Sequence, residues 1–149
     1  MYQRILVPVD GSATSNHALK EAIKFARLHH AQLKLIHVLE DMGYFDIDNY
    51  INYTELVESV RDSVKKMLEK ATELVRQEGV VVAEKLLEAQ GRRVANVIAD
   101  EAIQWPADLI IIGTHGRSGF NRLLLGSIAE GVLRTAKIPI LLIRCEDGG

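Results

Sequence analysis

Short, nearly continuous apolar runs alternate along this chain with longer segments in which apolar residues recur every three or four positions. A continuous apolar run is typical of a strand buried on both faces, whereas the i, i+3, i+4, i+7 spacing is typical of a helix with one buried face. The apolar runs predict strands at residues 5–9, 33–38, 80–87, 109–112 and 140–143. Because Pro8 cannot donate to a strand ladder, the pairing of the first strand is expected to end there.

The segments between these runs carry the helical spacing. The predicted helices run from a cap at Ser12 through Ala26, from a cap at Thr54 to Gly79, from Val94 to the Trp105–Pro106 step, and from Ser127 to Ala136. Residues 39–53 are acidic and aromatic and are expected to form a loop. This loop either covers a ligand, offers a docking surface, or folds its aromatic side chains back onto the second helix.

Strict alternation of strands and helices predicts the fold class. We expect an α/β protein of the Rossmann-like kind: a single doubly wound, five-stranded parallel sheet with helices on both faces, in one domain spanning residues 1–149. In such sheets, ligands bind beyond the carboxyl ends of the strands, where the winding reverses. If the first and fourth strands are neighbours there, Asp10 and Gly113 face one crevice.

Composition narrows the function classes. The 149 residues, 48% of them hydrophobic, suffice for one core. A net charge of −2 argues against nucleic acid as the main partner. No apolar run approaches the roughly 20 residues of a membrane span, and the first residues lack the anatomy of a signal peptide. A single cysteine, Cys145, cannot form an intramolecular disulfide, so a reducing, cytoplasmic setting is expected.

A glycine pattern follows the fourth predicted strand and carries the chemistry. Gly113, Gly116, Gly126 and Ser127 have the spacing G-x2-G-x9-G-S, and the last of them opens a predicted helix. Glycines let a backbone approach an anion and reach positive φ, and the free N–H groups of a helix start favour negative charge. The pattern therefore predicts a phosphate-binding loop. Neither the Walker A string nor the G-x-G-x-x-G dinucleotide fingerprint occurs in the chain.

The chain resembles the universal stress protein family over almost its whole length. The resemblance rests on residues 5–12, on His37-Val38, on residues 107–113, on the complete glycine spacing, and on residues 139–143. Family members that keep this loop bind ATP, and this chain resembles that subgroup. Any Mg²⁺ or Mn²⁺ is expected to arrive with the nucleotide phosphates, because the sequence has no cluster with metal-ligand spacing.

The resemblance assigns roles to individual residues. Those expected to bind the nucleotide are Pro8, Val9, Asp10, Val38, Gly113, Gly116, Arg117, Gly126, Ser127 and Ile128. Asp10 would accept from the ribose hydroxyls, although it can also close an Asx turn, and Val38 would hold adenine through its backbone. Arg117 and Arg122 either reach phosphate oxygens or are solvated. His115 is the histidine nearest this chemistry and offers a general base or a metal ligand.

Three functions remain open at this point. The first is a homodimeric ATP-binding regulator, paired through Ile140, Leu141, Leu142 and Ile143, with an unidentified protein partner and at most slow hydrolysis. The second is an ATP-using enzyme that adenylates a substrate or acts as an ATPase. The third is a partner-binding dimer with a vestigial loop. The absence of a Walker-type lysine and of an acidic pair for metals favours the first, with no catalytic residue assigned.

Overall fold

The computed structural model describes residues 2–41, 50–115 and 125–144. Its strands are β1 (Arg4–Pro8), β2 (Gln32–Leu39), β3 (Val82–Glu88), β4 (Leu109–Gly113) and β5 (Ile140–Ile143). Its helices are α1 (Ala13–His29), α2 (Tyr50–Gln77), α3 (Val94–Gln104) and α4 (Ser127–Thr135). Strands and helices alternate in the order that the hydrophobic pattern predicts.

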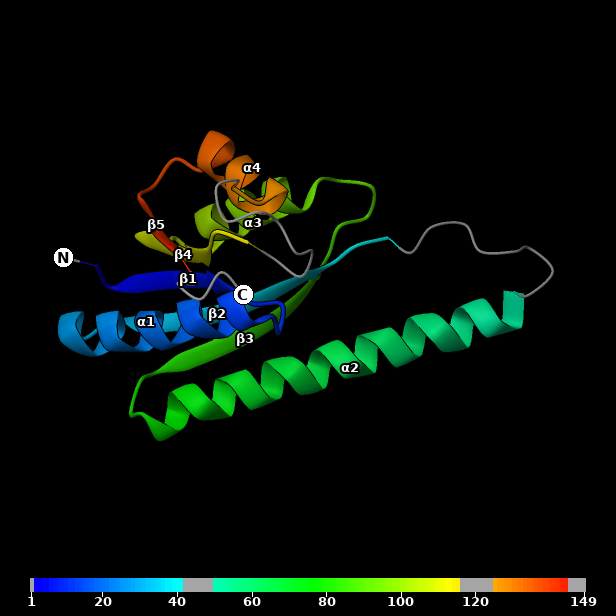
Figure 1. The fold of residues 1–149 in the computed structure, drawn as a ribbon, viewed down its shortest axis with the longest axis horizontal. Coiled ribbons are helices and arrows are strands. Elements are labelled where there is room, and N and C mark those ends of the chain that lie inside the picture. The colour runs from blue at the N-terminus through cyan, green and yellow to red at the C-terminus, as the bar shows by residue number, and fades with distance from the viewer. Residues whose placement is uncertain (1, 42–49, 116–124, 145–149) are drawn as a thin grey trace.

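All five strands run parallel in one sheet with the order β3-β2-β1-β4-β5. Helices α1 and α2 cover one face, and α3 and α4 cover the other (Figure 1). The predicted fold class is therefore confirmed, and so is the pairing of β1 with β4 on which the shared crevice depends. Strand β5 lies at one edge of the sheet and β3 at the other.

Two apolar layers hold the helices to the sheet. Along β1, Ile5 and Val7 face the layer under α1 and α2, while Leu6 between them faces the layer under α3 and α4. All three side chains are fully buried. Side chains of a strand alternate between faces, so a central strand covered on both sides must be apolar at every position. This requirement explains why β1 and β4 contain continuous apolar runs.

Most helix and strand ends lie within one residue of their predicted positions. Ser12 caps α1, since its Oγ accepts from the Ser15 N–H at 3.2 Å, and Gly79 follows α2 with a φ of +78°. Strand β3 begins at Val82, two residues later than expected. The reason is local, because the Val80 N–H donates to the Val75 carbonyl and so still belongs to the turn that ends α2.

The start of α2 corrects one prediction. The helix begins at Tyr50, so Thr54 lies inside it rather than capping it, and residues 50–53 are helical rather than part of a loop. Residues 50–53 contain neither glycine nor proline, so nothing stops the helical hydrogen bonds from continuing toward the N-terminus. Residues 42–49, the rest of the predicted aromatic loop, lie outside the described part of the chain.

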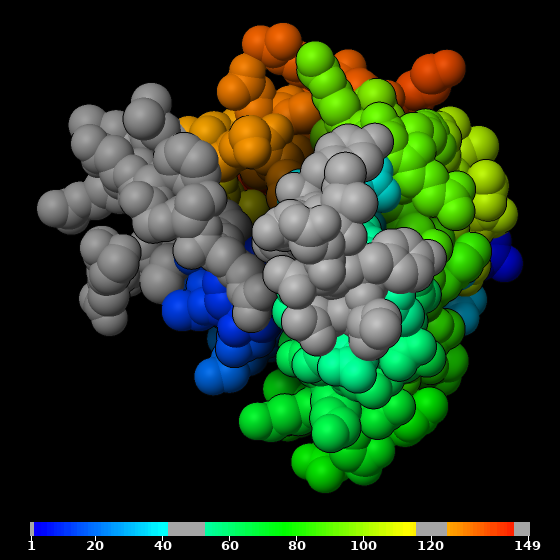
Figure 2. All heavy atoms as spheres, turned by 90° about the vertical axis from the view of Figure 1, so that its right-hand side faces the viewer, coloured from blue at the N-terminus to red at the C-terminus, as the bar shows by residue number. Residues whose placement is uncertain are grey.

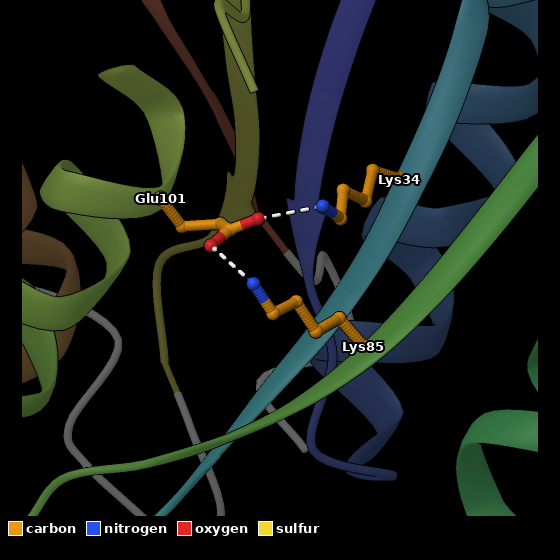
Figure 3. Close-up of polar contacts among 3 residues, drawn as sticks. All are labelled: Lys34, Lys85 and Glu101. Carbon is orange, nitrogen blue, oxygen red and sulfur yellow. Dashed lines mark hydrogen bonds and ion pairs between the residues drawn. The ribbon is translucent and has the colours of Figure 1, made fainter. Parts of the chain in front are cut away.

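One buried charge cluster interrupts the apolar layer under α3. Glu101 is only 3% exposed, and its two carboxylate oxygens bind Lys34 of β2 and Lys85 of β3, at 2.6 and 3.2 Å (Figure 3). The Lys34 ammonium also lies 5.7 Å from the centroid of the Trp105 ring. A buried carboxylate needs partners for both oxygens, and the two lysines supply them. The cluster therefore ties α3 to the β2–β3 side of the sheet.

Candidate functional site

The winding of the sheet reverses between β1 and β4, and a cavity of about 950 Å³ opens beyond their carboxyl ends. Figure 2 faces this end of the molecule, with α4 (orange) in the upper part of the view and α1 (blue) and α2 (blue-green) in the lower part. The structure brings eight of the predicted binding residues into the cavity wall. They are Pro8, Val9, Asp10, Val38, Gly113, Gly126, Ser127 and Ile128. The other two, Gly116 and Arg117, lie outside the described residues, as does Arg122.

The turn after β1 fixes the Asp10 carboxylate at the cavity. Its Oδ1 accepts from the Ser12 N–H at 2.8 Å, and the Asp10 N–H donates to Ser15 Oγ at 3.0 Å. Gly11 between them has a φ of +81°, which explains why glycine follows the aspartate. The Asx turn that was weighed against a ligand role is thus present, and it uses one carboxylate oxygen. The second oxygen remains for another donor.

The first turn of α4 forms another part of the wall. Gly126 is its N-cap and carries no side chain that could cap the helix, while Ser127, Ile128 and Ala129 line the cavity. The N–H groups of a first helical turn have no partner within the helix, and the helix dipole makes them favourable toward anions. The Gly126 N–H donates to the Thr114 carbonyl at 2.7 Å, which brings the two ends of the 115–125 segment together.

Neither described glycine of the G-x2-G-x9-G-S pattern has a positive φ. Gly126 has a φ of −62°, and Gly113 is not among the described glycines with positive φ, so that part of the prediction is wrong at both positions. At Gly113 the constraint is space: a Cβ would lie 2.7 Å from Thr14 Cγ2 and 3.2 Å from the Thr14 carbonyl oxygen. Gly113 therefore allows the first turn of α1 to pack against the end of β4.

Apolar and polar residues both line the cavity. Apolar residues come from β2, from β4, from α3, from α4 and from the position after β3, and they include Val38, Ala89, Ala95, Ile98, Ile112 and Ile128. Polar and charged residues that line it are Asp10, Ser15, His37, Glu40, Asp41, Arg92, Arg93, Thr114, His115 and Ser127. The volume lies in the usual range for a small-molecule site, and the wall carries more polar groups than such sites usually do.

Sequence reasoning missed the turn between β3 and α3. Gly91, Arg92 and Arg93 line the cavity, with φ of +82° at Gly91 and +50° at Gln90. Arg92 pairs with Asp100, whereas the exposed Arg93 is the N-cap residue of α3. The position of this turn in the sequence could have identified it. The turn follows a parallel strand, so it lies at the same edge of the sheet as Asp10 and the glycine loop.

His115 lines the cavity, and its Nδ1 lies 3.3 Å from Thr114 Oγ1.

Within residues 2–41, 50–115 and 125–144, no three His, Cys, Asp or Glu side chains are grouped so that they could hold a metal ion. The described helices also include none that is long and apolar enough to cross a membrane.

Known proteins are similar to this chain in sequence and in fold. The family model of the universal stress protein family matches residues 1–144. A universal stress protein of Methanocaldococcus jannaschii is 31% identical over 144 residues, which cover 97% of this chain and 83% of the relative. The structure of UspA from Lactobacillus plantarum has a TM-score of 0.83 at 27% identity and covers 96% of this chain and 98% of its own. The structure from Archaeoglobus fulgidus in complex with dAMP has a TM-score of 0.69 at 28% identity and covers 95% and 98%.

Proposed function

Because this chain belongs to the universal stress protein family, we propose that it is an ATP-binding regulatory protein whose bound nucleotide sets the conformation that a partner recognises. The observation that carries the proposal is that one cavity is lined by apolar residues such as Val38, by Asp10, and by the first turn of α4, which has no side-chain cap. The parts of a nucleotide match these groups: a flat base, a sugar with hydroxyl donors, and a chain of phosphates. The dAMP bound to the Archaeoglobus fulgidus relative agrees with that reading.

In this proposal each wall holds one portion of ATP. The base lies against Val38, Val9 and Pro8, the ribose donates to Asp10, and the phosphates accept from the first-turn N–H groups of α4. Gly113, Gly116, Arg117 and Gly126 belong to the loop around the phosphates. A divalent ion enters as the phosphate complex, because the described residues offer no cluster of their own for it. The chain acts as a homodimer in the cytoplasm, and any hydrolysis is slow.

Two measurements test this proposal. Mass spectrometry of the purified, denatured protein is expected to release ATP or ADP, and calorimetric titration of the nucleotide-free protein with ATP and Mg²⁺ is expected to show one site per chain. A partner-binding dimer with a vestigial loop would give neither result. A single-turnover assay with labelled ATP separates the regulator from an adenylating enzyme, since the regulator should leave most ATP intact. Absence of any nucleotide binding would overturn the proposal.

Asp10 is expected to favour ribonucleotides over their 2′-deoxy analogues. Its free carboxylate oxygen gains one more donor from a 2′-hydroxyl, and a hydrogen bond to a charged group contributes about 1.5–3 kcal/mol. ATP should therefore bind roughly tenfold or more tightly than 2′-deoxy-ATP, and Asp10→Ala should remove most of the difference. The dAMP complex of the relative makes this a preference and not an exclusion. Equal parental affinities for the two nucleotides in calorimetry would contradict the role.

Strand β5 is expected to pair with its copy in a second protomer. The Thr114 N–H donates to the Ile143 carbonyl, so the backbone N–H and C=O groups of Ile143 point toward β4. These groups alternate in direction along a strand. Those of Leu141 therefore also point toward β4, whereas those of Ile140 and Leu142 point away from the sheet. An apolar edge strand with open peptide groups is a template for another strand. Light scattering should show a dimer for the parent chain and a shift toward monomer for Leu142→Pro, which removes one outward N–H. A parent that stays monomeric at tens of micromolar would contradict the pairing.

A further inference from the structure

One polar contact at the wall of the cavity is made by His37, a side chain to which the proposed function gives no role. His37 lies in β2, and its Nδ1 is 2.7 Å from the Val9 carbonyl oxygen. A carbonyl oxygen only accepts, so the imidazole donates through Nδ1–H. Val9 and Val38, the residues on either side of this contact, both line the cavity.

The contact stands where the β1–β2 ladder would otherwise continue. In a parallel ladder, a residue donates its N–H to one residue of the neighbouring strand and accepts, through its carbonyl, from the residue two positions further along that strand. The Val9 N–H donates to the Ile36 carbonyl at 2.8 Å, so the Val9 carbonyl would next accept from the Val38 N–H. Within the described chain no such bond is present, and the β1–β2 register ends at Pro8 opposite Ile36.

We propose that His37 is a positioning residue that ends the ladder one rung early and thereby keeps the backbone of Val38 open to the ligand. The imidazole N–H competes with the Val38 N–H for the Val9 carbonyl oxygen, which has two lone pairs but, among the described residues, accepts only from His37. The N–H and carbonyl of one strand residue point to the same side. Because the Ile36 carbonyl accepts from Val9, both backbone groups of Val38 point to the β1 side, beyond the last paired residue of β1, and Val38 lines the cavity. This inference rests on the proposed nucleotide site, and it names the contact that keeps the Val38 backbone groups available to the base.

The first test needs no nucleotide. In ligand-free protein, NMR hydrogen exchange should show the Val38 amide exchanging faster than the laddered Ile36 amide. In His37→Leu the Val9 carbonyl loses its donor and should capture the Val38 N–H, which slows Val38 exchange by about tenfold or more. His37→Asn retains an amide donor at the same branch and should exchange like the parent. A Val38 amide that is already protected in the parent, or is unchanged in His37→Leu, would overturn the inference.

The second test uses binding. ATP affinity is expected to fall about three- to tenfold in His37→Leu, the loss that corresponds to one neutral hydrogen bond, and to be restored in His37→Asn. Inosine triphosphate is the control nucleotide, because its ring presents N–H where adenine presents a lone pair, so its affinity should change less. Equal losses for the two nucleotides would indicate a merely structural role and reject the inference. If the parent binds neither nucleotide, the proposed function fails, while the exchange experiment still decides the role of His37.

Discussion

Replacing Glu101 by alanine is expected to lower the free energy of unfolding by about 3–5 kcal/mol, a large part of the roughly 5–15 kcal/mol of a typical domain. The destabilisation comes from the lysine that the variant leaves without a partner. The Lys34 side chain is 13% exposed and binds Glu101 at 2.6 Å, so the variant leaves its ammonium group buried without a carboxylate. Denaturant unfolding of both proteins, with the slopes compared, measures the difference.

Lys85 supplies the matched control for that variant. It contacts the same carboxylate at 3.2 Å, but its side chain is 45% exposed, so the charge is solvated when the partner is lost. Lys85→Ala should lower the free energy of unfolding by about 1 kcal/mol or less. The double variant Glu101→Leu, Lys34→Met should be more stable than Glu101→Leu alone, because it removes the stranded charge. If Glu101→Ala costs no more than Lys85→Ala, the burial argument is wrong.

The same cluster shows where the hydrophobic pattern falls short. The pattern identifies Val94, Val97 and Ile98 as the buried face of α3, and Glu101 continues that face at the next helical spacing. Lys34 likewise interrupts an apolar strand at a position that faces the core. A charged residue at a core position is ambiguous when taken alone. Two residues of opposite sign on different core-facing elements are a usable signal, but their contact depends on a sheet order that the sequence does not specify.

Some features of the candidate site are set by residues that are neighbours in the sequence, and others depend on contacts between distant elements. The Asp10-Gly11-Ser12 turn and the capping role of Ser12 follow from neighbouring residues, and the structure contains both. The contribution of Arg93 and the contact between His37 and Val9 depend on which strands are neighbours. The reason for glycine at position 113 also lies in another element, the first turn of α1. Local chemistry was therefore predictable, whereas long-range steric and ladder effects were not.

Replacing Ser127 by aspartate is expected to weaken ATP binding by more than about a hundredfold while leaving the ligand-free fold at least as stable. A carboxylate in the first turn of a helix contributes about 0.3–1 kcal/mol of stability, so α4 should not suffer. The same carboxylate lies in the cavity wall where the proposed phosphates bind. Two like charges about 4 Å apart repel by about 4 kcal/mol at an effective dielectric constant near 20, which is ample for that loss.

Three comparisons separate this repulsion from other causes. Ser127→Ala removes only the hydroxyl and should weaken ATP binding by about ten- to a hundredfold. Gln77→Glu adds the same charge at the exposed last residue of α2, which does not line the cavity, and should leave the affinity unchanged. Adenosine lacks phosphates, so its affinity should hardly respond to Ser127→Asp. Calorimetry gives each affinity and a thermal melt gives each stability. A Ser127→Asp protein that binds ATP like the parent would place the phosphates elsewhere, since a triphosphate at the start of α4 must feel a carboxylate in the same helical turn.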